Sequence, residues 1–214
     1  MNPILEQLAK IRVIPVVVID DEAGAEPLAQ ALLEGGLPTM EITFRTEAAK
    51  GALIRIAKSF PDVLLGAGTI LSVDQVKTAV SCGARYIVSP GLNRKVVEYC
   101  LDNDIVVTPG VITPTEIEAA MDLGLGVVKF FPAGAVGGLP YLKAISGAYR
   151  KMKFIPTGGI DESNLSEYLN FSQVMACGGS WMVKSDLVIG KRFDEISRLA
   201  ARAVGIARDT GARV

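Results

Sequence analysis

The stretch VIPVVVIDDEAGAEPLAQALLEGGLPTMEITF, residues 13–44, contains the repeating unit on which the fold prediction rests. Residues 13–19 form a β-branched run typical of a buried strand, and residues 22–34 continue with a helical pattern. A Gly-Gly pair, residues 35–36, follows the helix, as glycine often does after a helix C-terminus. Residues 39–44 then begin a second strand. A strand, a helical crossover and another strand indicate two parallel strands of one sheet.

The same alternation of short apolar strands and amphipathic helices continues along the chain. Further strands are predicted at residues 63–67, 86–88, 105–107, 126–132, 154–155 and 174–176, and helices at 46–59, 73–82, 94–101, from 113 onward, 139–145, 162–169 and 194–208. Eight such units predict an α/β fold, a small (β/α)8 TIM barrel forming one domain over residues 1–214. We expect a short N-terminal helix near residues 2–10 to cover its bottom. An open doubly wound sheet is disfavoured because no G-x-G-x-x-G loop follows the first strand.

The composition fits one globular domain without a large charged surface. Of the 214 residues, 50% are hydrophobic and 21% are charged, and the formal net charge is −1. No basic block predicts binding to nucleic acid or to a membrane surface. We expect neither a secretory signal nor a membrane span, since Glu6 interrupts the start and no run approaches about 20 apolar residues. Because Cys82, Cys100 and Cys177 lack zinc spacing, we expect buried free thiols and a cytoplasmic location.

Lys129 lies within GVVKFFP, residues 126–132, a run that otherwise predicts a buried strand. An ammonium group in such a strand is costly unless it is paired or neutralised. Desolvation favours the neutral amine, a nucleophile that can form Schiff bases. The chain has no histidine, so the commonest general base is absent. The alternative is a lysine at a strand end whose head group reaches water.

The second predicted strand alternates polar and apolar residues. One face carries Thr39, Glu41, Thr43 and Arg45, and the residues between them are apolar. An exposed edge strand would alternate in the same way, but a closed barrel has no edge. The apolar face should therefore meet the helices, and the polar face should point into the barrel mouth, where such barrels carry their chemistry. This placement makes Glu41 a candidate catalytic carboxylate.

Three further strand ends carry polar or glycine-containing segments. GAGT ends with Thr69, whose hydroxyl can bind a ligand, while its glycines allow close backbone approach. SPG contains Pro90, and TPG contains Pro109. We interpret Pro109 as part of an ordinary turn.

Glycine pairs follow the seventh and eighth predicted strands. They are Gly158-Gly159 and Gly178-Gly179, and Ser180 follows the second pair. Phosphate often binds at this place in such barrels, because several backbone N–H groups can converge on an anion. Two pairs at these two strand ends predict a phosphate site, and tight turns alone are the alternative.

An amine (Lys129), a carboxylate (Glu41) and a guanidinium (Arg45) are thus predicted to face one mouth beside a phosphate cradle. Lysine can condense with a ketone to give an iminium, which acts as an electron sink. A nearby carboxylate can transfer protons, and arginine can hold a substrate carboxylate through paired hydrogen bonds. The pattern predicts an aldolase acting on a 2-keto acid with a phosphate at its far end.

The chain resembles the family of 2-keto-3-deoxy-6-phosphogluconate (KDPG) and 4-hydroxy-2-oxoglutarate (KHG) aldolases over nearly its full length. The resemblance rests on the motifs EITFRT (41–46), GAGT (66–69), SPG (89–91), KFFPA (129–133), PTGGI (156–160) and GGSW (178–181). It implies a homotrimeric barrel enzyme with a Schiff-base mechanism, a phosphorylated 2-keto acid as substrate, and no cofactor or metal ion.

The resemblance also implies a role for each matching residue. Lys129 matches the Schiff-base lysine, and Glu41 matches the general acid–base that works through a water molecule. The substrate-binding groups are matched by Arg45 and Thr69 for the pyruvate carboxylate, Pro90 for the pocket wall, Thr157 for facial selectivity, and Gly158, Gly159 and Ser180 for the phosphate.

The implied reaction cleaves 2-dehydro-3-deoxy-6-phosphogluconate to pyruvate and glyceraldehyde 3-phosphate. A second implied substrate is 4-hydroxy-2-oxoglutarate, which would yield pyruvate and glyoxylate. The galactonate-derived epimer of the first substrate is an alternative, as is a phosphosugar isomerase or decarboxylating synthase that needs no iminium. A non-catalytic barrel that binds a phosphorylated metabolite is a third reading, but it would not need both Lys129 and Glu41.

Overall fold

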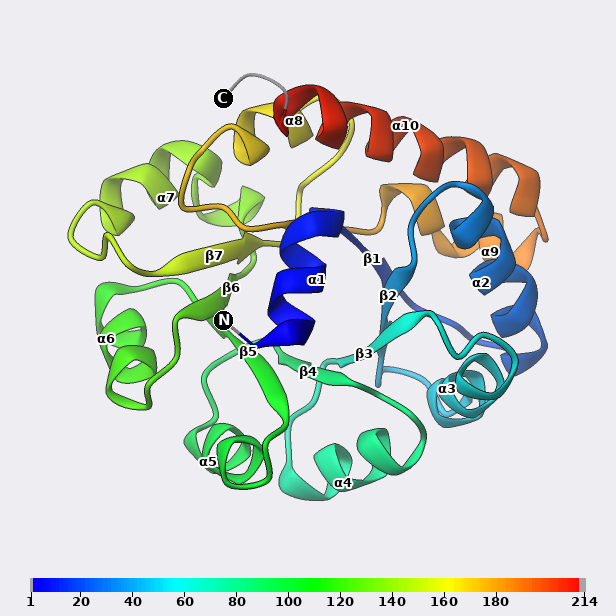
Figure 1. Cartoon of the computed structure of the whole chain (residues 1–214), viewed down its shortest axis with the longest axis horizontal. Helices are drawn as coiled ribbons and strands as arrows, with labels where there is room; N and C mark the ends of the chain where they lie inside the picture. Colours follow the sequence, from blue (N-terminus) through cyan, green and yellow to red (C-terminus); the bar gives the residue numbers. More distant parts are fainter. Residues whose placement is uncertain (1, 212–214) are drawn as a thin grey trace.

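The computed structural model of the chain describes residues 2–211 and contains a barrel of parallel strands ringed by helices (Figure 1). Strands β1 to β7 pair in chain order, and β8 pairs with β1. The arrangement confirms the predicted (β/α)8 barrel. The strands are β1 (Val13–Val17), β2 (Thr39–Thr43), β3 (Leu64–Gly68), β4 (Tyr86–Ser89), β5 (Val106–Val111), β6 (Val127–Phe130), β7 (Lys153–Pro156) and β8 (Cys177–Gly179).

The helices form the outer layer and pack their apolar faces on the barrel wall. Their bounds are α1 (Pro3–Ile11), α2 (Ala25–Glu34), α3 (Ala48–Ser59), α4 (Val73–Ser81), α5 (Arg94–Asp102), α6 (Pro114–Asp122), α7 (Gly138–Ser146), α8 (Leu165–Leu169), α9 (Ser185–Ile189) and α10 (Phe193–Gly211), with 3-10 helices η1 (Glu22–Gly24), η2 (Gly134–Val136) and η3 (Trp181–Val183). Within the described part of the chain, no helix combines the length and apolar character that crossing a membrane requires.

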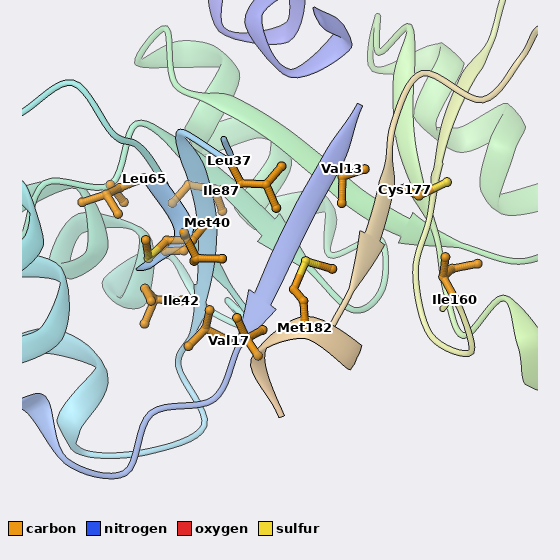
Figure 2. Close-up of a cluster of buried hydrophobic side chains, with 14 of the residues drawn as sticks. Val13, Val17, Leu37, Met40, Ile42, Leu65, Ile87, Ile160, Cys177 and Met182 are labelled. Atoms are coloured by element: carbon orange, nitrogen blue, oxygen red, sulfur yellow. The ribbon is translucent and has the colours of Figure 1, made fainter. Parts of the chain in front are cut away.

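Strand alternation divides the buried residues into two layers. Outward-facing side chains such as Val17, Met40 and Ile42 pack against the helices (Figure 2). Inward-facing side chains such as Ile14 and Tyr86 form a separate cluster inside the barrel. The polar face of β2 points inward, as predicted, so its hydroxyl and carboxyl groups are buried within the barrel.

Helix α1 covers the end of the barrel from which the strands start (Figure 1). The Asn2 side chain caps this helix by accepting a hydrogen bond of 2.9 Å from the N–H of Ile4. Leu8 is fully buried and packs with the inward-facing residues of several strands. The predicted cover at the barrel bottom is therefore confirmed, and the opposite end remains open for a site.

Two element boundaries near the end of the chain differ from the prediction. The eighth strand was expected at residues 174–176, but β8 is Cys177–Gly179, because only these residues pair in register with β1. Among the described residues, β7 and β8 share only the isolated bridges Phe154↔Val174 and Thr157↔Gly178. Helix α8 begins at Leu165 rather than 162, because Asp161 accepts a 2.8 Å hydrogen bond from the N–H of Ser163 and forms a turn.

The interpretation of Pro109 as part of a turn is wrong. Pro109 lies inside β5 and pairs with Ser89 of β4, and the next residue, Gly110, pairs with Lys129 of β6. Neighbours on both sides thus keep this segment extended to Val111. A methyl group at Gly110 would lie 2.0 Å from the carbonyl oxygen of Pro90, so the glycine permits close packing of the two strand ends.

The three cysteines are buried and unpaired, as predicted. Burial raises the pKa of the Cys100 thiol to about 11. The Cys177 thiol lies inside the protein at β8, and burial raises its pKa further. The Cys100 and Cys177 thiols therefore stay protonated near neutral pH.

Candidate active site

Strand β6 carries Lys129 into the barrel, because Val128 and Phe130 on either side face the helices. The Lys129 side chain is only 6% exposed, and its Nζ lies 3.4 Å from Oε1 of Glu41. Glu41 comes from β2 and is 3% exposed. The alternative of a lysine head group reaching water is therefore wrong. Each of the two buried charges offsets the desolvation cost of the other.

The Lys129 ammonium also lies over the ring of Phe131, with Nζ 4.9 Å from the ring centroid. A cation over an aromatic face is attracted by the ring quadrupole. The sequence analysis did not single out Phe131. Its position two residues after Lys129 was the only sequence feature that could have indicated this contact. Glu41 and Phe131 together hold the amine in one part of the mouth.

Two glycines of β3 make room for the side chains around Glu41. Gly66 pairs with Glu41 in the β2–β3 register, and Gly68 is the next inward-facing residue. A methyl group at Gly68 would lie 2.0 Å from Oε1 of Glu41, and one at Gly66 would lie 2.2 Å from the Tyr86 ring. These two glycines thus let side chains inside the barrel lie directly against the backbone of β3.

Tyr86 lies buried beneath this pair, in the inner cluster. Burial raises the pKa of Tyr86 far above its usual value, and the nearby charge of Glu41 raises it further, against the opposing hydrogen bond with Thr39. The Tyr86 and Thr39 hydroxyls are 3.3 Å apart. Tyr86 is therefore a neutral phenol that packs below Glu41.

Arg45 follows β2 and reaches the mouth from the side opposite β6. Its Nε donates a hydrogen bond of 3.1 Å to Oγ1 of Thr69, at the end of β3. Thr69 has a φ of 58°, a left-handed conformation that is uncommon for a residue other than glycine. The structure thus brings together the two residues predicted to bind a carboxylate, and one of them has a strained backbone.

A pocket of about 410 Å³ opens at this end of the barrel. Lys129 and Arg45 line it, together with the predicted residues Thr157, Gly158, Gly159 and Ser180. Glu41 and Thr69 do not line this pocket themselves but contact lining residues, namely Lys129 and Arg45. Pro90 is also outside the lining and lies against Gly110, the residue that pairs with Lys129.

The two glycine pairs have different structures. Gly158 and Gly159 have φ values of 90° and 79°, so this turn requires glycine, and both line the pocket. Gly178 and Gly179 lie within β8 rather than after it. A methyl group at Gly178 would lie 2.4 Å from Oγ1 of Thr157, so that glycine chiefly makes space for a pocket side chain.

Comparison with known proteins identifies the family. The sequence profile of the KDPG and KHG aldolase family matches residues 4–199. The 2-dehydro-3-deoxy-phosphogluconate aldolase of Treponema pallidum is 44% identical over 206 residues, covering 96% of this chain and 98% of the relative. The chain belongs to the KDPG and KHG aldolase family.

Solved structures of KDPG aldolases share the barrel as well as the sequence. The enzyme from Legionella pneumophila, with pyruvate captured at low pH as a covalent carbinolamine intermediate, is 39% identical with a TM-score of 0.91. The match covers 94% of this chain and 98% of that one. The KHG/KDPG aldolase of Escherichia coli is 40% identical over 192 residues, covering 90% of each chain.

This member of the aldolase family has one further pocket cation that the sequence analysis missed. Lys184 follows η3 and lines the same pocket as Ser180 and the Gly158-Gly159 turn. No periodic pattern or motif marks Lys184 in the sequence. Only the fold reveals it, by turning the chain at η3 back over the end of β8.

Proposed function

We propose that the protein is a class I aldolase that cleaves 2-dehydro-3-deoxy-6-phosphogluconate to pyruvate and glyceraldehyde 3-phosphate. The observation that carries this proposal is the buried Lys129 Nζ, 3.4 Å from a Glu41 carboxylate oxygen at the mouth of the barrel. Membership of the KDPG and KHG aldolase family supports it, as do relatives that carry the same activity in their names.

In the proposed mechanism Lys129 transfers its ammonium proton to the Glu41 carboxylate, and the resulting amine attacks the C2 ketone of the substrate to form a carbinolamine. Glu41 returns this proton to the departing hydroxyl, and loss of water gives an iminium, which withdraws electrons from the C3–C4 bond. Glu41 accepts the proton of the C4 hydroxyl as that bond breaks and the aldehyde forms. The remaining enamine takes a proton at C3, and hydrolysis releases pyruvate and the free amine. The prediction that no metal ion or cofactor takes part stays a prediction.

The other predicted residues hold the two ends of the substrate. Arg45 and Thr69 bind the carboxylate next to the ketone, a role supported by their mutual hydrogen bond beside the pocket. Gly158, Gly159 and Ser180 bind the phosphate, supported by their place in the lining. Further predicted roles are facial selectivity for Thr157 and the wall beside the ketone for Pro90.

Two related substrates remain to be tested. Cleavage of 4-hydroxy-2-oxoglutarate is supported by the E. coli relative named for both reactions. The galactonate epimer has weaker support, because the solved structure named KDPGal is only 25% identical, with a TM-score of 0.83. Relative rates on the three substrates rank these possibilities.

The mechanism is tested by borohydride reduction in the presence of pyruvate, followed by peptide mass spectrometry. We expect a stable pyruvate-derived adduct on Lys129, and none in the Lys129→Ala variant. Lys153→Ala is the control, because the Lys153 amine binds the Ser172 carbonyl oxygen at the start of β7, far along the strand from the mouth. An unlabelled Lys129 in folded protein would refute the Schiff-base mechanism.

The role of Glu41 is tested separately by Glu41→Gln. We expect cleavage to slow about 10²- to 10⁴-fold, the range typical of general acid–base catalysis. Trapping with pyruvate in the same variant shows whether the amine still condenses. An unchanged cleavage rate would remove Glu41 from the mechanism.

Three broader features remain part of the proposal. We propose one domain over residues 1–214, supported by the single barrel over residues 2–211. A cytoplasmic location is supported by three buried, unpaired cysteines, which suit a reducing compartment. The homotrimer implied by the family resemblance is the third.

A further inference from the structure

Lys184 stands at the end of the pocket where the proposed phosphate site lies. It shares the lining with Gly158, Gly159 and Ser180. Its own backbone is fixed, because the Lys184 carbonyl accepts hydrogen bonds of 2.9 Å and 3.2 Å from the first turn of α9. The side chain is exposed and, among the described residues, has no carboxylate within ion-pair distance. Lys184 is thus a rigidly anchored cation with a free head group.

The charged residues that line the pocket are all positive. Arg45, Lys129 and Lys184 are its only charged lining residues among those described, and no carboxylate lines it. The proposed substrate carries a carboxylate and a phosphate, so its charge is opposite at both ends. Such a pocket attracts an anion and disfavours a neutral ligand of the same shape.

The fold separates the three cations around the mouth. Arg45 follows β2 and is tied to Thr69 at the end of β3, whereas Lys184 follows β8, on the other side of β1. Lys129 comes from β6, and the Gly158-Gly159 turn follows the neighbouring strand β7. Arg45 therefore suits the carboxylate end of a substrate bound at Lys129, and Lys184 suits the end that lies on the glycine turn.

Lys184 also borders a second, shallow depression that contains Asp161. Hydrogen bonds from Ser163 are the main cause that holds the pKa of Asp161 below its usual value, and the charge of Lys184 contributes. Asp161 is therefore the carboxylate whose charge Lys184 influences, although the two do not form an ion pair. Asp161 accepts two hydrogen bonds from Ser163, so its carboxylate is held in place without an ion pair to Lys184.

We propose that Lys184 binds the phosphate of the substrate and determines the preference for phosphorylated over unphosphorylated sugar acids. The inference rests on the proposed aldolase function and deepens it. Glycine N–H groups and a serine hydroxyl are neutral donors, and a cation beside them strengthens the binding of a phosphate dianion. Lysine supplies that charge as a flexible point cation, a common phosphate binder in proteins.

The test compares Lys184→Gln and Lys184→Arg on 2-keto-3-deoxy-6-phosphogluconate and on the same sugar acid without phosphate. For Lys184→Gln we expect kcat/KM on the phosphorylated substrate to fall about 10- to 100-fold, the usual effect of losing one charged hydrogen bond. The unphosphorylated substrate should be cleaved at an unchanged rate. Lys184→Arg should restore much of the lost preference. Lys191→Gln is the control, because Lys191 is exposed nearby but lines a different depression.

A readout without catalysis makes the test independent of turnover. Inorganic phosphate should protect the wild-type protein against thermal unfolding, and Lys184→Gln should lose most of this effect. Unchanged phosphate binding, or an equal loss of activity on both sugar acids, would overturn the role of Lys184. Failure of the aldolase function itself would be seen separately, as the absence of a pyruvate adduct in the wild-type protein.

Discussion

At the scale of single residues, the proposed chemistry depends on holding two opposite charges together where little water reaches them. Lys129 and Glu41 lie on β6 and β2, nearly opposite each other across the barrel. Their side chains meet at 3.4 Å because no side chain at Gly68 blocks the carboxylate. The absence of a side chain at Gly68 therefore determines where the carboxylate of Glu41, the proposed proton-transfer residue, can lie.

The Gly68→Ala variant tests this positioning. The new methyl group would lie 2.0 Å from Oε1 of Glu41, so the carboxylate must move away from Lys129. We expect kcat to fall about 10²-fold, as for other misplacements of about 1 Å. Steady-state kinetics on the phosphorylated substrate measure the loss.

Gly126→Ala is the matched control for this variant. Gly126 precedes β6 at the other end of the barrel, and a methyl group there would contact nothing within 4 Å. It should keep full activity. Normal turnover in Gly68→Ala would show that Glu41 does not depend on the space left by glycine at position 68.

The nature of the proposed catalytic pair could be predicted from the sequence, but its surroundings could not. An ammonium in an apolar strand and a carboxylate on a polar strand face are local patterns. The notch at Gly68, the ring of Phe131 and the cation of Lys184 depend on which strands become neighbours. Only the closed barrel brings these residues to the pair, so their contacts with it could not be predicted from the local sequence.

At the scale of secondary-structure elements, α1 serves the stability of the barrel and not the site. Leu8 is fully buried among inward-facing residues at the closed end. We expect Leu8→Ala to reduce the free energy of unfolding by about 2–5 kcal/mol, as for other buried leucines. Chemical denaturation measures the change, and kcat of the folded variant should be unaltered.

Leu101→Ala is the comparison for α1, because Leu101 is a helical leucine with 41% exposure. It should reduce the free energy of unfolding much less than Leu8→Ala does. Equal costs for the two variants would mean that α1 does not seal the barrel.

The start of α6 makes part of the stability dependent on pH. Burial alone would raise the pKa of Glu116, but the N–H groups of Ile112 and Thr113 and the Thr113 hydroxyl donate to its carboxylate and lower the pKa below its usual value. A lowered folded-state pKa stabilises the protein above the unfolded value of about 4.3. This contribution is lost as the pH falls through the folded-state pKa.

We therefore expect Glu116→Gln to destabilise the protein by about 1 kcal/mol at pH 7, since hydrogen bonds to a charged group are the stronger kind. The difference from wild type should shrink below about pH 4. Urea denaturation of both proteins between pH 7 and pH 3 measures it. A difference that stays constant over this range would exclude the charge as its cause.

Element order could be predicted from the sequence, whereas some element limits could not. Residues 174–176 are as apolar as a strand, yet the strand is Cys177–Gly179, because pairing with β1 decides it. Pro109 has the local signature of a turn, yet partners on β4 and β6 keep β5 extended through it. In both places contacts between distant segments overrode local preference.

At the scale of the whole molecule, the family resemblance predicts three copies of the chain. Several exposed large hydrophobic side chains lie along the ring, among them Ile54, Leu71, Val80 and Met121. Burying such side chains between copies would be favourable. We expect sedimentation equilibrium to give three times the 22.7 kDa of one chain, and a mass of one chain at micromolar concentration would contradict this.

The junction between β7 and β8 is the weakest part of the barrel wall, because the two strands are poorly paired. Continuous ladders close the other junctions, but only isolated bridges join these two strands in the described chain. The glycine turn follows β7 and Ser180 follows β8, so the proposed phosphate cradle spans this joint. We expect backbone amides along the joint to exchange with deuterated water sooner than those of β2 and β3. The barrel would then open locally at the proposed phosphate site while Lys129 and Glu41 stay in position. A phosphorylated product could leave in this way while the other product is still covalently bound to Lys129.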